Sequence, residues 1–150
     1  MMLPSGRRLA VDIGDVRTGI AISDAAGILA SPYSTITGED YLAQLAEIIR
    51  NEEVAVLYIG LPLHLSGVEG SAASRVRLEV EKLKEMLADT VFVRLLDERL
   101  TTKSASMKIL SRQSKPSRSN IDQLAAVEIL EFALNAERLN QELAGHEPIG

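Results

Sequence analysis

The 150-residue sequence contains no cysteine, and aromatic residues make up only 3% of it. The absence of cysteine excludes disulfide bonds, thiolate metal sites and thiol catalysis. Because aromatic side chains are so scarce, the core must consist of Val, Ile, Leu and Ala. No apolar run is long enough to span a bilayer, and the first eight residues lack the hydrophobic stretch of a signal peptide. We therefore expect a cytoplasmic protein with no membrane partner.

The net charge of −5 argues against a nucleic-acid partner, but the charges are unevenly distributed. The segment 99–121 contains no acidic residue and is rich in basic ones. Such a segment is either an anion-binding surface or a solvated basic helix and loop. Charge alone does not separate these two interpretations. The basic residues are Arg99, Lys103, Lys108, Arg112, Lys115 and Arg118.

Hydrophobic periodicity predicts an α/β protein with the order strand, strand, strand, helix, strand, helix, strand, helix, helix. The first three strands follow one another closely, as in antiparallel hairpins, and the later strands join through helices in parallel. We expect a five-stranded mixed sheet with helices on both faces. The strands are expected at 8–14, 18–24, 27–36, 54–59 and 91–96, and the helices around 42–49, 76–87, 102–110 and 121–139.

The length is that of one domain, and we find no internal repeat and no sign of a second domain. We expect a single domain over residues 1–150, with a core at about 8–139 and a frayed C-terminal tail from Ala144. Ligands of such sheets bind beyond the carboxyl ends of the parallel strands, so functional residues are expected there.

Asp12 lies inside the first expected strand, between apolar neighbours. Aspartate is depleted in strands, and a buried charge is costly without a partner or a metal ion. It could instead accept hydrogen bonds from the backbone of the following turn. Its place near the end of a central strand favours a functional role.

Asp97 and Glu98 directly follow the fifth expected strand and precede Arg99. A pair of carboxylates there is either a metal ligand with its neighbour or half of a surface salt bridge with Arg99. Taken alone, the pattern favours the salt bridge. Thr101 and Thr102 are expected to cap the next helix rather than to act as nucleophiles.

Asp122 has two interpretations. Ser119 and Asp122 have the spacing of a capping box at a helix N-terminus. However, Asp122 also heads a helical stripe formed by Ala126, Ile129 and Ala133. A carboxylate on that stripe would face the sheet, and small residues would let the helix approach Asp12.

Three converging carboxylates would suit hard divalent cations, which prefer oxygen ligands. Two such ions about 4 Å apart can activate water and stabilise the leaving oxygen in phosphodiester hydrolysis. This chemistry requires neither cysteine nor histidine. Basic residues between Glu98 and Asp122 could bind phosphates beside the ions.

Four motifs resemble those of the YqgF/RuvX family of Holliday-junction resolvases and pre-16S rRNA nucleases. The likeness extends over about residues 8–134, and the pairing of the second and third motifs is specific. The motifs are Asp12-Ile-Gly14 with Arg17-Thr-Gly19 and Ser23-Asp24; Gly60-Leu-Pro-Leu63 with Gly67 and Gly70; Asp97-Glu-Arg-Leu-Thr-Thr102; and Ile121-Asp122 with Ala125-Ala126 and Ile129-Leu130.

The resemblance implies a ribonuclease H-like fold and a Mg²⁺- or Mn²⁺-dependent endonuclease of the bacterial cytoplasm. It implies that the catalytic, metal-binding residues are Asp12, Glu98 and Asp122, with Asp97 as an alternate ligand or supporting residue. Arg17 and Arg99 would contact or support the phosphates. Of the basic run, we expect Lys103, Arg112, Lys115 and Arg118 to bind substrate as well.

This sequence departs from the family pattern at two places. Val16 stands where the family commonly has Lys, and His64-Leu-Ser-Gly67 replaces the usual Asn-Met-Asp-Gly. Both changes remove a charge beside the expected site and leave the three carboxylates in place.

Two other functions remain open from the sequence. One is a nucleotide-binding relative of the actin-like ATPases, which share this fold but enclose nucleotide between two domains. The other is a non-catalytic RNA- or ribosome-binding factor. For a nuclease, precursor rRNA and branched DNA are equally plausible substrates, and the two-fold symmetry of a four-way junction would suit a homodimer.

Overall fold

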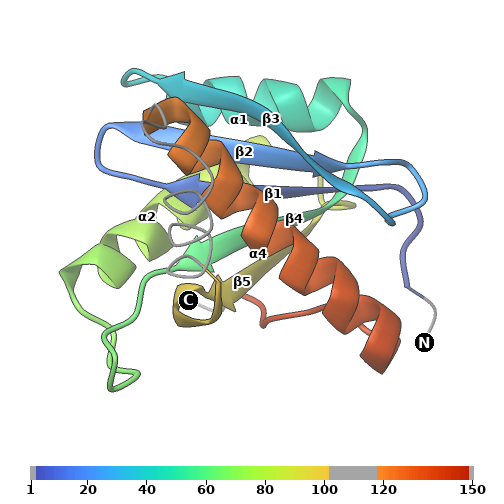
Figure 1. The fold of residues 1–150 in the computed structure, drawn as a ribbon. Coiled ribbons are helices and arrows are strands. Elements are labelled where there is room, and N and C mark those ends of the chain that lie inside the picture. The colour runs from blue at the N-terminus through green and yellow to red at the C-terminus, as the bar shows by residue number, and fades with distance from the viewer. Residues whose placement is uncertain (1–2, 102–117, 149–150) are drawn as a thin grey trace.

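A computed structural model describes residues 3–101 and 118–148, with the backbone alone for 118–120. Its five-stranded sheet has the order β3-β2-β1-β4-β5 (Figure 1). Strand β1 pairs antiparallel with β2 and parallel with β4, so the expected mixed sheet is confirmed. The strands are β1 (Arg7–Ile13), β2 (Arg17–Ser23), β3 (Ala30–Thr37), β4 (Val54–Leu61) and β5 (Phe92–Asp97).

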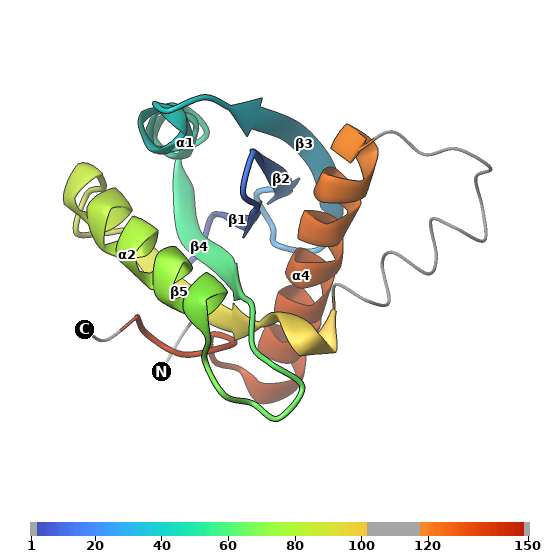
Figure 2. The same cartoon turned by 90° about the vertical axis from the view of Figure 1, so that its left-hand side faces the viewer.

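Helices cover both faces of the sheet, as the sequence predicts (Figure 2). Helices α1 (Tyr41–Asn51) and α2 (Ser71–Met86) lie on one face, and α4 (Arg118–Asn140) lies on the other. The alternation of side chains along each strand assigns them to these two layers. On β1, Leu9 and Val11 join the α1–α2 core, whereas Ala10 joins the α4 core. Asp12 therefore shares the α4 face of the sheet with Ala10.

Helix α4 meets the sheet through a layer rich in alanine. Ala126 and Ala133 of the helix are fully buried with Ala10 of β1 and Ala21 of β2. Small side chains allow a helix backbone to approach a sheet closely. The stripe predicted below Asp122 is thus confirmed as a core-facing stripe.

The N-terminus of α4 differs from the prediction. The helix begins at Arg118, three residues before the expected start, so Ser119 is inside the helix and not its N-cap. The capping-box interpretation is therefore wrong, because a cap residue must precede the first helical turn. The expected helix 102–110 lies outside the described residues, as do Lys103, Arg112 and Lys115.

The C-terminal tail packs against the sheet, which corrects the expectation of fraying from Ala144. Ala144 is buried, and His146 forms an antiparallel bridge with Leu95 on the outer edge of β5. Arg94 adds a hydrogen bond from Nε to the Ala144 carbonyl oxygen at 2.8 Å. The tail therefore covers backbone groups of an edge strand, which sequence periodicity cannot reveal. Within 3–101 and 118–148, no helix combines the length and apolar character needed to cross a membrane.

Candidate active site

The three predicted carboxylates lie at one edge of the sheet. Asp12 is the penultimate residue of β1, Glu98 opens the short helix η1 (Glu98–Leu100) directly after β5, and Asp122 lies near the start of α4. Asp12 and Glu98 form a side-chain hydrogen bond, and the charge of Asp122 acts on Asp12. Glu98 and Asp122 follow Asp12 by 86 and 110 residues in the sequence, yet both lie beside it in the fold.

Two glycines make room for this convergence. Gly19 of β2 is the register partner of Asp12, and a side chain there would overlap the backbone oxygen of Asp122. Gly60 of β4 is the counterpart on the other neighbouring strand, where an added Cβ would lie 2.9 Å from Glu98 Cγ. Each glycine thus admits one of the two carboxylates that approach Asp12. Both glycines belong to the sequence motifs, but this role was not predicted from them, although a glycine inside a strand is a signal of close approach.

Asp12 is the electrostatic centre of the site. Burial raises its pKa to about 9, helped by the hydrogen bond with Glu98 and by the negative charges of Glu98 and Asp122. Asp12 is therefore protonated at neutral pH in the absence of a cation, and its carboxyl can donate a hydrogen bond to Glu98. Carboxyl groups share a proton in this way when no cation close by balances their negative charges.

Asp122 has a cationic partner. Arg17 Nε donates to Asp122 Oδ2 at 3.0 Å, and both side chains are about three-quarters buried, with 28% and 24% of their surfaces exposed. Arg17 opens β2, on the strand that also carries Gly19. The predicted supporting arginine is therefore next to a predicted carboxylate, although a distance of 105 residues separates them in the sequence.

Asp97 behaves as the salt-bridge interpretation predicts. Its carboxylate accepts hydrogen bonds from the backbone N–H of Arg99 at 2.9 Å and from the Arg99 guanidinium at 3.0 Å. These contacts lower the pKa of Asp97, chiefly through the guanidinium. Arg99 Nη1 also donates to the Leu65 carbonyl oxygen at 3.1 Å, so this arginine ties the loop after β4 to the end of β5.

Thr101 follows η1 and is almost fully buried, and its hydroxyl has no hydrogen-bond partner in the part of the chain that the structure describes.

Four of the predicted substrate-binding residues are not tested by the structure. Lys103, Arg112 and Lys115 lie outside the described residues, and Arg118 is described only by its backbone.

The site supplies oxygen donors only, which is the donor set of Mg²⁺ and Mn²⁺. Among the described residues, however, no three acidic or histidine side chains are already arranged around a common ion position. The side chains of Asp12 and Glu98 are hydrogen-bonded to each other, while Asp122 forms an ion pair with Arg17. Joint metal binding by Asp12, Glu98 and Asp122 remains a prediction, supported by donor chemistry and by the excess of negative charge.

The chain is similar to known proteins over most of its length. The family model described as "RuvX: Holliday junction resolvase" matches residues 6–136. A protein of Streptomyces avermitilis named "Putative pre-16S rRNA nuclease" is 44% identical, covering 97% of this chain and 96% of its own length. A protein of the same name from Leifsonia xyli subsp. xyli is 42% identical, covering 95% and 94%.

Among solved structures, T. thermophilus RuvC in complex with a Holliday junction substrate aligns with a TM-score of 0.57. The alignment covers 89% of this chain and 96% of that one, at 14% identity. At that identity the likeness concerns the fold, and it confirms the expected ribonuclease H-like class.

Proposed function

Because the chain belongs to the RuvX family, we propose that it is an endonuclease that hydrolyses phosphodiester bonds in structured nucleic acid with divalent metal ions. The observation that carries the proposal is the meeting of Asp12, Glu98 and Asp122 at one sheet edge, where Asp12 and Glu98 share a hydrogen bond. Nuclease function agrees with the names of the relatives and with the family description.

The charge of the site supports Mg²⁺ or Mn²⁺ as cofactor. Among the described residues, three carboxyl groups lie beside one arginine, and burial together with the neighbouring carboxylates raises the pKa of Asp12, so a divalent ion would supply the positive charge that this site is short of. Asp12, Glu98 and Asp122 would hold the ions, with Asp12 giving up its proton on binding. Such ions supply Lewis-acid activation of water and charge neutralisation at the phosphate.

The two arginines would have different roles. Arg17 is partly exposed beside Asp122, so its remaining guanidinium N–H groups can bind a substrate phosphate. Arg99 is engaged by Asp97 and by the backbone of Leu65, and we infer that it mainly supports the loop after β4. Arg17 is thus the arginine that we assign to the scissile region.

The test is a cleavage assay on a four-way DNA junction and on precursor 16S rRNA, each with Mg²⁺ and with Mn²⁺. Glu98→Gln should lower the cleavage rate on the order of 10²–10³-fold, as expected for the loss of one charged group from a preorganised site. The matched control is Asp97→Asn, which removes the same charge one residue away and keeps an acceptor for the Arg99 backbone. It should stay within about threefold of wild type.

The assay also separates the alternatives. Equal cleavage by wild type and Glu98→Gln would exclude the carboxylate mechanism. Binding of precursor rRNA without cleavage under any metal condition would identify a non-catalytic RNA-binding factor. Saturable ATP binding without nuclease activity would favour the actin-like reading instead.

The preferred substrate decides whether a homodimer is required. Resolution of a four-way junction needs two symmetric cuts and hence two active sites. We expect a dimer by light scattering if junction cleavage exceeds rRNA cleavage, and no such requirement if rRNA is preferred.

A further inference from the structure

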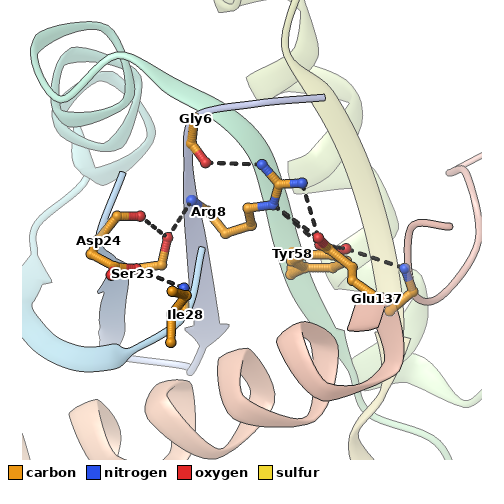
Figure 3. A network of polar contacts seen from close by, with 8 residues as sticks. Gly6, Arg8, Ser23, Asp24, Ile28, Tyr58 and Glu137 are labelled. Carbon is orange, nitrogen blue, oxygen red and sulfur yellow. Dashed lines mark hydrogen bonds and ion pairs between the residues drawn. The ribbon is translucent and has the colours of Figure 1, made fainter. Parts of the chain in front are cut away.

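A second polar cluster lies on the same face of the sheet, at the opposite end of β1 from Asp12. Arg8, Tyr58 and Glu137 are almost completely buried there, with 4%, 0% and 5% of their surfaces exposed. Arg8 Nη2 lies 2.9 Å from Glu137 Oε1, and the Tyr58 hydroxyl donates to Glu137 Oε2 (Figure 3). The nuclease chemistry proposed above uses none of these residues.

Further hydrogen bonds fix the cluster on all sides. Arg8 Nη1 donates to the Gly6 carbonyl oxygen at 2.9 Å, and the Arg8 backbone N–H donates to Ser23 Oγ at 2.8 Å (Figure 3). The backbone N–H of Ala144, beyond the end of α4, donates to the Tyr58 hydroxyl at 3.1 Å. Burial and the bond to Glu137 raise the pKa of Tyr58, so its hydroxyl remains a donor.

The three elements that carry Arg8, Tyr58 and Glu137 also contribute to the carboxylate site. Arg8 and Asp12 are on β1, Tyr58 lies two residues before Gly60 on β4, and Glu137 and Asp122 are both on α4. Within α4, Glu137 and Asp122 are separated by 15 residues, or about 22 Å of helix. The cluster and the site are thus the two polar ends of one contact between helix and sheet.

The apolar layer between the two ends contains many alanines. Ala10, Ala21, Ala126 and Ala133 are fully buried in it. Ile129 and Leu130 of α4 are fully buried in the same layer. Small side chains let the helix backbone lie close to the sheet, so even a small axial shift of the helix would displace Asp122 from Asp12. Asp122 lies against Gly19, where its Cβ is 2.9 Å from the position that an added Cβ would take.

We propose that the Arg8–Tyr58–Glu137 cluster is a positioning device that sets the axial register of α4 and thereby places Asp122 against Asp12 and Glu98. This inference rests on the proposed function only for its catalytic consequence. Buried ion pairs often add little stability relative to apolar residues, whereas their directional bonds select one arrangement. Glu137, with oxygens bonded to two different strands, has that directional character.

The test replaces the cluster by an apolar one, in the triple variant Arg8→Met, Tyr58→Phe and Glu137→Leu. Because no unpaired charge remains buried, this variant is expected to unfold at a urea concentration similar to that of wild type. We expect kcat to fall at least tenfold with KM within threefold, and Mn²⁺ binding by calorimetry to weaken at least fivefold. A role limited to stability would leave kcat and Mn²⁺ affinity unchanged in a protein of wild-type stability.

A distance measurement tests the register without any reference to activity. The chain has no cysteine, so spin labels can be attached to Ser31→Cys on β3 and Asn135→Cys on α4, both at exposed positions. One narrow distance distribution is expected in the otherwise wild-type protein, and a shifted or broadened one in the triple variant. Identical distributions would overturn the proposal, even if the protein proved to have no nuclease activity.

If the triple variant does not fold, the single variant Tyr58→Phe, measured with the same spin labels, tests the positioning role. It removes one hydrogen bond from Glu137 and leaves the ion pair with Arg8 in place. A broadened label distribution with a two- to fivefold loss of kcat would support the positioning role. A wild-type distribution would overturn it.

Discussion

Charged groups occur at both ends of the contact between β1 and α4, yet the two ends are built differently. At the end near Glu137, one cation and one carboxylate are paired, and a tyrosine and backbone groups satisfy the remaining bonds. At the end near Asp12, counting only residues 3–101 and 118–148, three carboxyl groups lie beside one paired guanidinium, that of Arg17. Within these residues, the charges of the first end are balanced, whereas the second end has more acidic than basic groups.

This difference separates a structural polar cluster from a functional one on physical grounds. A charge-balanced cluster loses stability when one of its charged members is removed, because the opposite charge is then buried without a partner. A cluster with excess charge gains stability when one charge is removed, because the repulsion within it falls. Active sites commonly contain such unfavourable arrangements, and their relief by mutation reduces activity. Removal of one carboxylate should therefore have opposite effects on stability at the two ends.

The largest effect is expected at the charge-balanced end. Glu137→Ala leaves the Arg8 guanidinium buried without its carboxylate, so the free energy of unfolding should fall by about 3–5 kcal/mol. Urea denaturation measures this change. Glu131→Ala, on the exposed side of the same helix, is the control and should remain within about 0.5 kcal/mol of wild type. Equal effects of the two substitutions would remove the distinction between the ends.

Gly19→Ala should cost about 3 kcal/mol and abolish most of the cleavage activity, because the new methyl group overlaps the backbone of Asp122. The helix must then move away from Asp12. The control is Gly27→Asn, at a position with a left-handed φ of 71° and no heavy atom within 4 Å of an added Cβ. Asparagine tolerates that conformation, so activity should be unchanged. Full activity of Gly19→Ala would contradict the close-approach role.

Asp12→Asn is expected to stabilise the metal-free protein at neutral pH by about 1–2 kcal/mol while it abolishes cleavage. The pKa of Asp12 is about 9 in the folded chain, above its ordinary value of 3.8. Folding therefore takes up a proton between these values, and the wild type loses stability relative to Asp12→Asn as pH rises through this window.

Unfolding curves of both proteins at pH 4, 7 and 9 test this pH dependence. The difference in the free energy of unfolding between Asp12→Asn and wild type should be smallest at pH 4. Asp97→Asn provides the contrast. The pKa of Asp97 is lowered by Arg99, so its small stabilising contribution is present above pH 4 and lost on acidification. If Asp12→Asn destabilises the protein at pH 7, the site near Asp12 has no excess of negative charge.

The smallest effect on stability is expected for Arg17→Gln. The pair with Asp122 is partly exposed, so its loss should lower the free energy of unfolding by less than about 1 kcal/mol. Its effect on substrate binding should be larger and should decrease with added salt. Arg75→Gln, which breaks the pair with the mostly exposed Asp15, is the control and should leave substrate binding unchanged.

The order of the strands and of most helices could be predicted because it depends on local patterns. Alternation places Leu9 and Val11 on one face of β1 and Ala10 on the other, as the structure confirms. The start of α4 and the docking of Ala144 could not be predicted, since both depend on neighbours distant in the sequence. Local patterns also could not show whether Asp97 or Glu98 lies beside Asp12, because the two residues are adjacent in the sequence and only the fold separates their contacts.

The α/β class, the oxygen donors of the site and the motifs that carry the family resemblance follow from the order of the residues alone, because residue types and spacings are properties of the chain. The pairing of the charges, in contrast, follows from the fold. Arg8 finds Glu137 at a separation of 129 residues, and Arg17 finds Asp122 at 105. Such pairs form where strands and a helix cross, and their energies depend on distances and burial that no local pattern encodes.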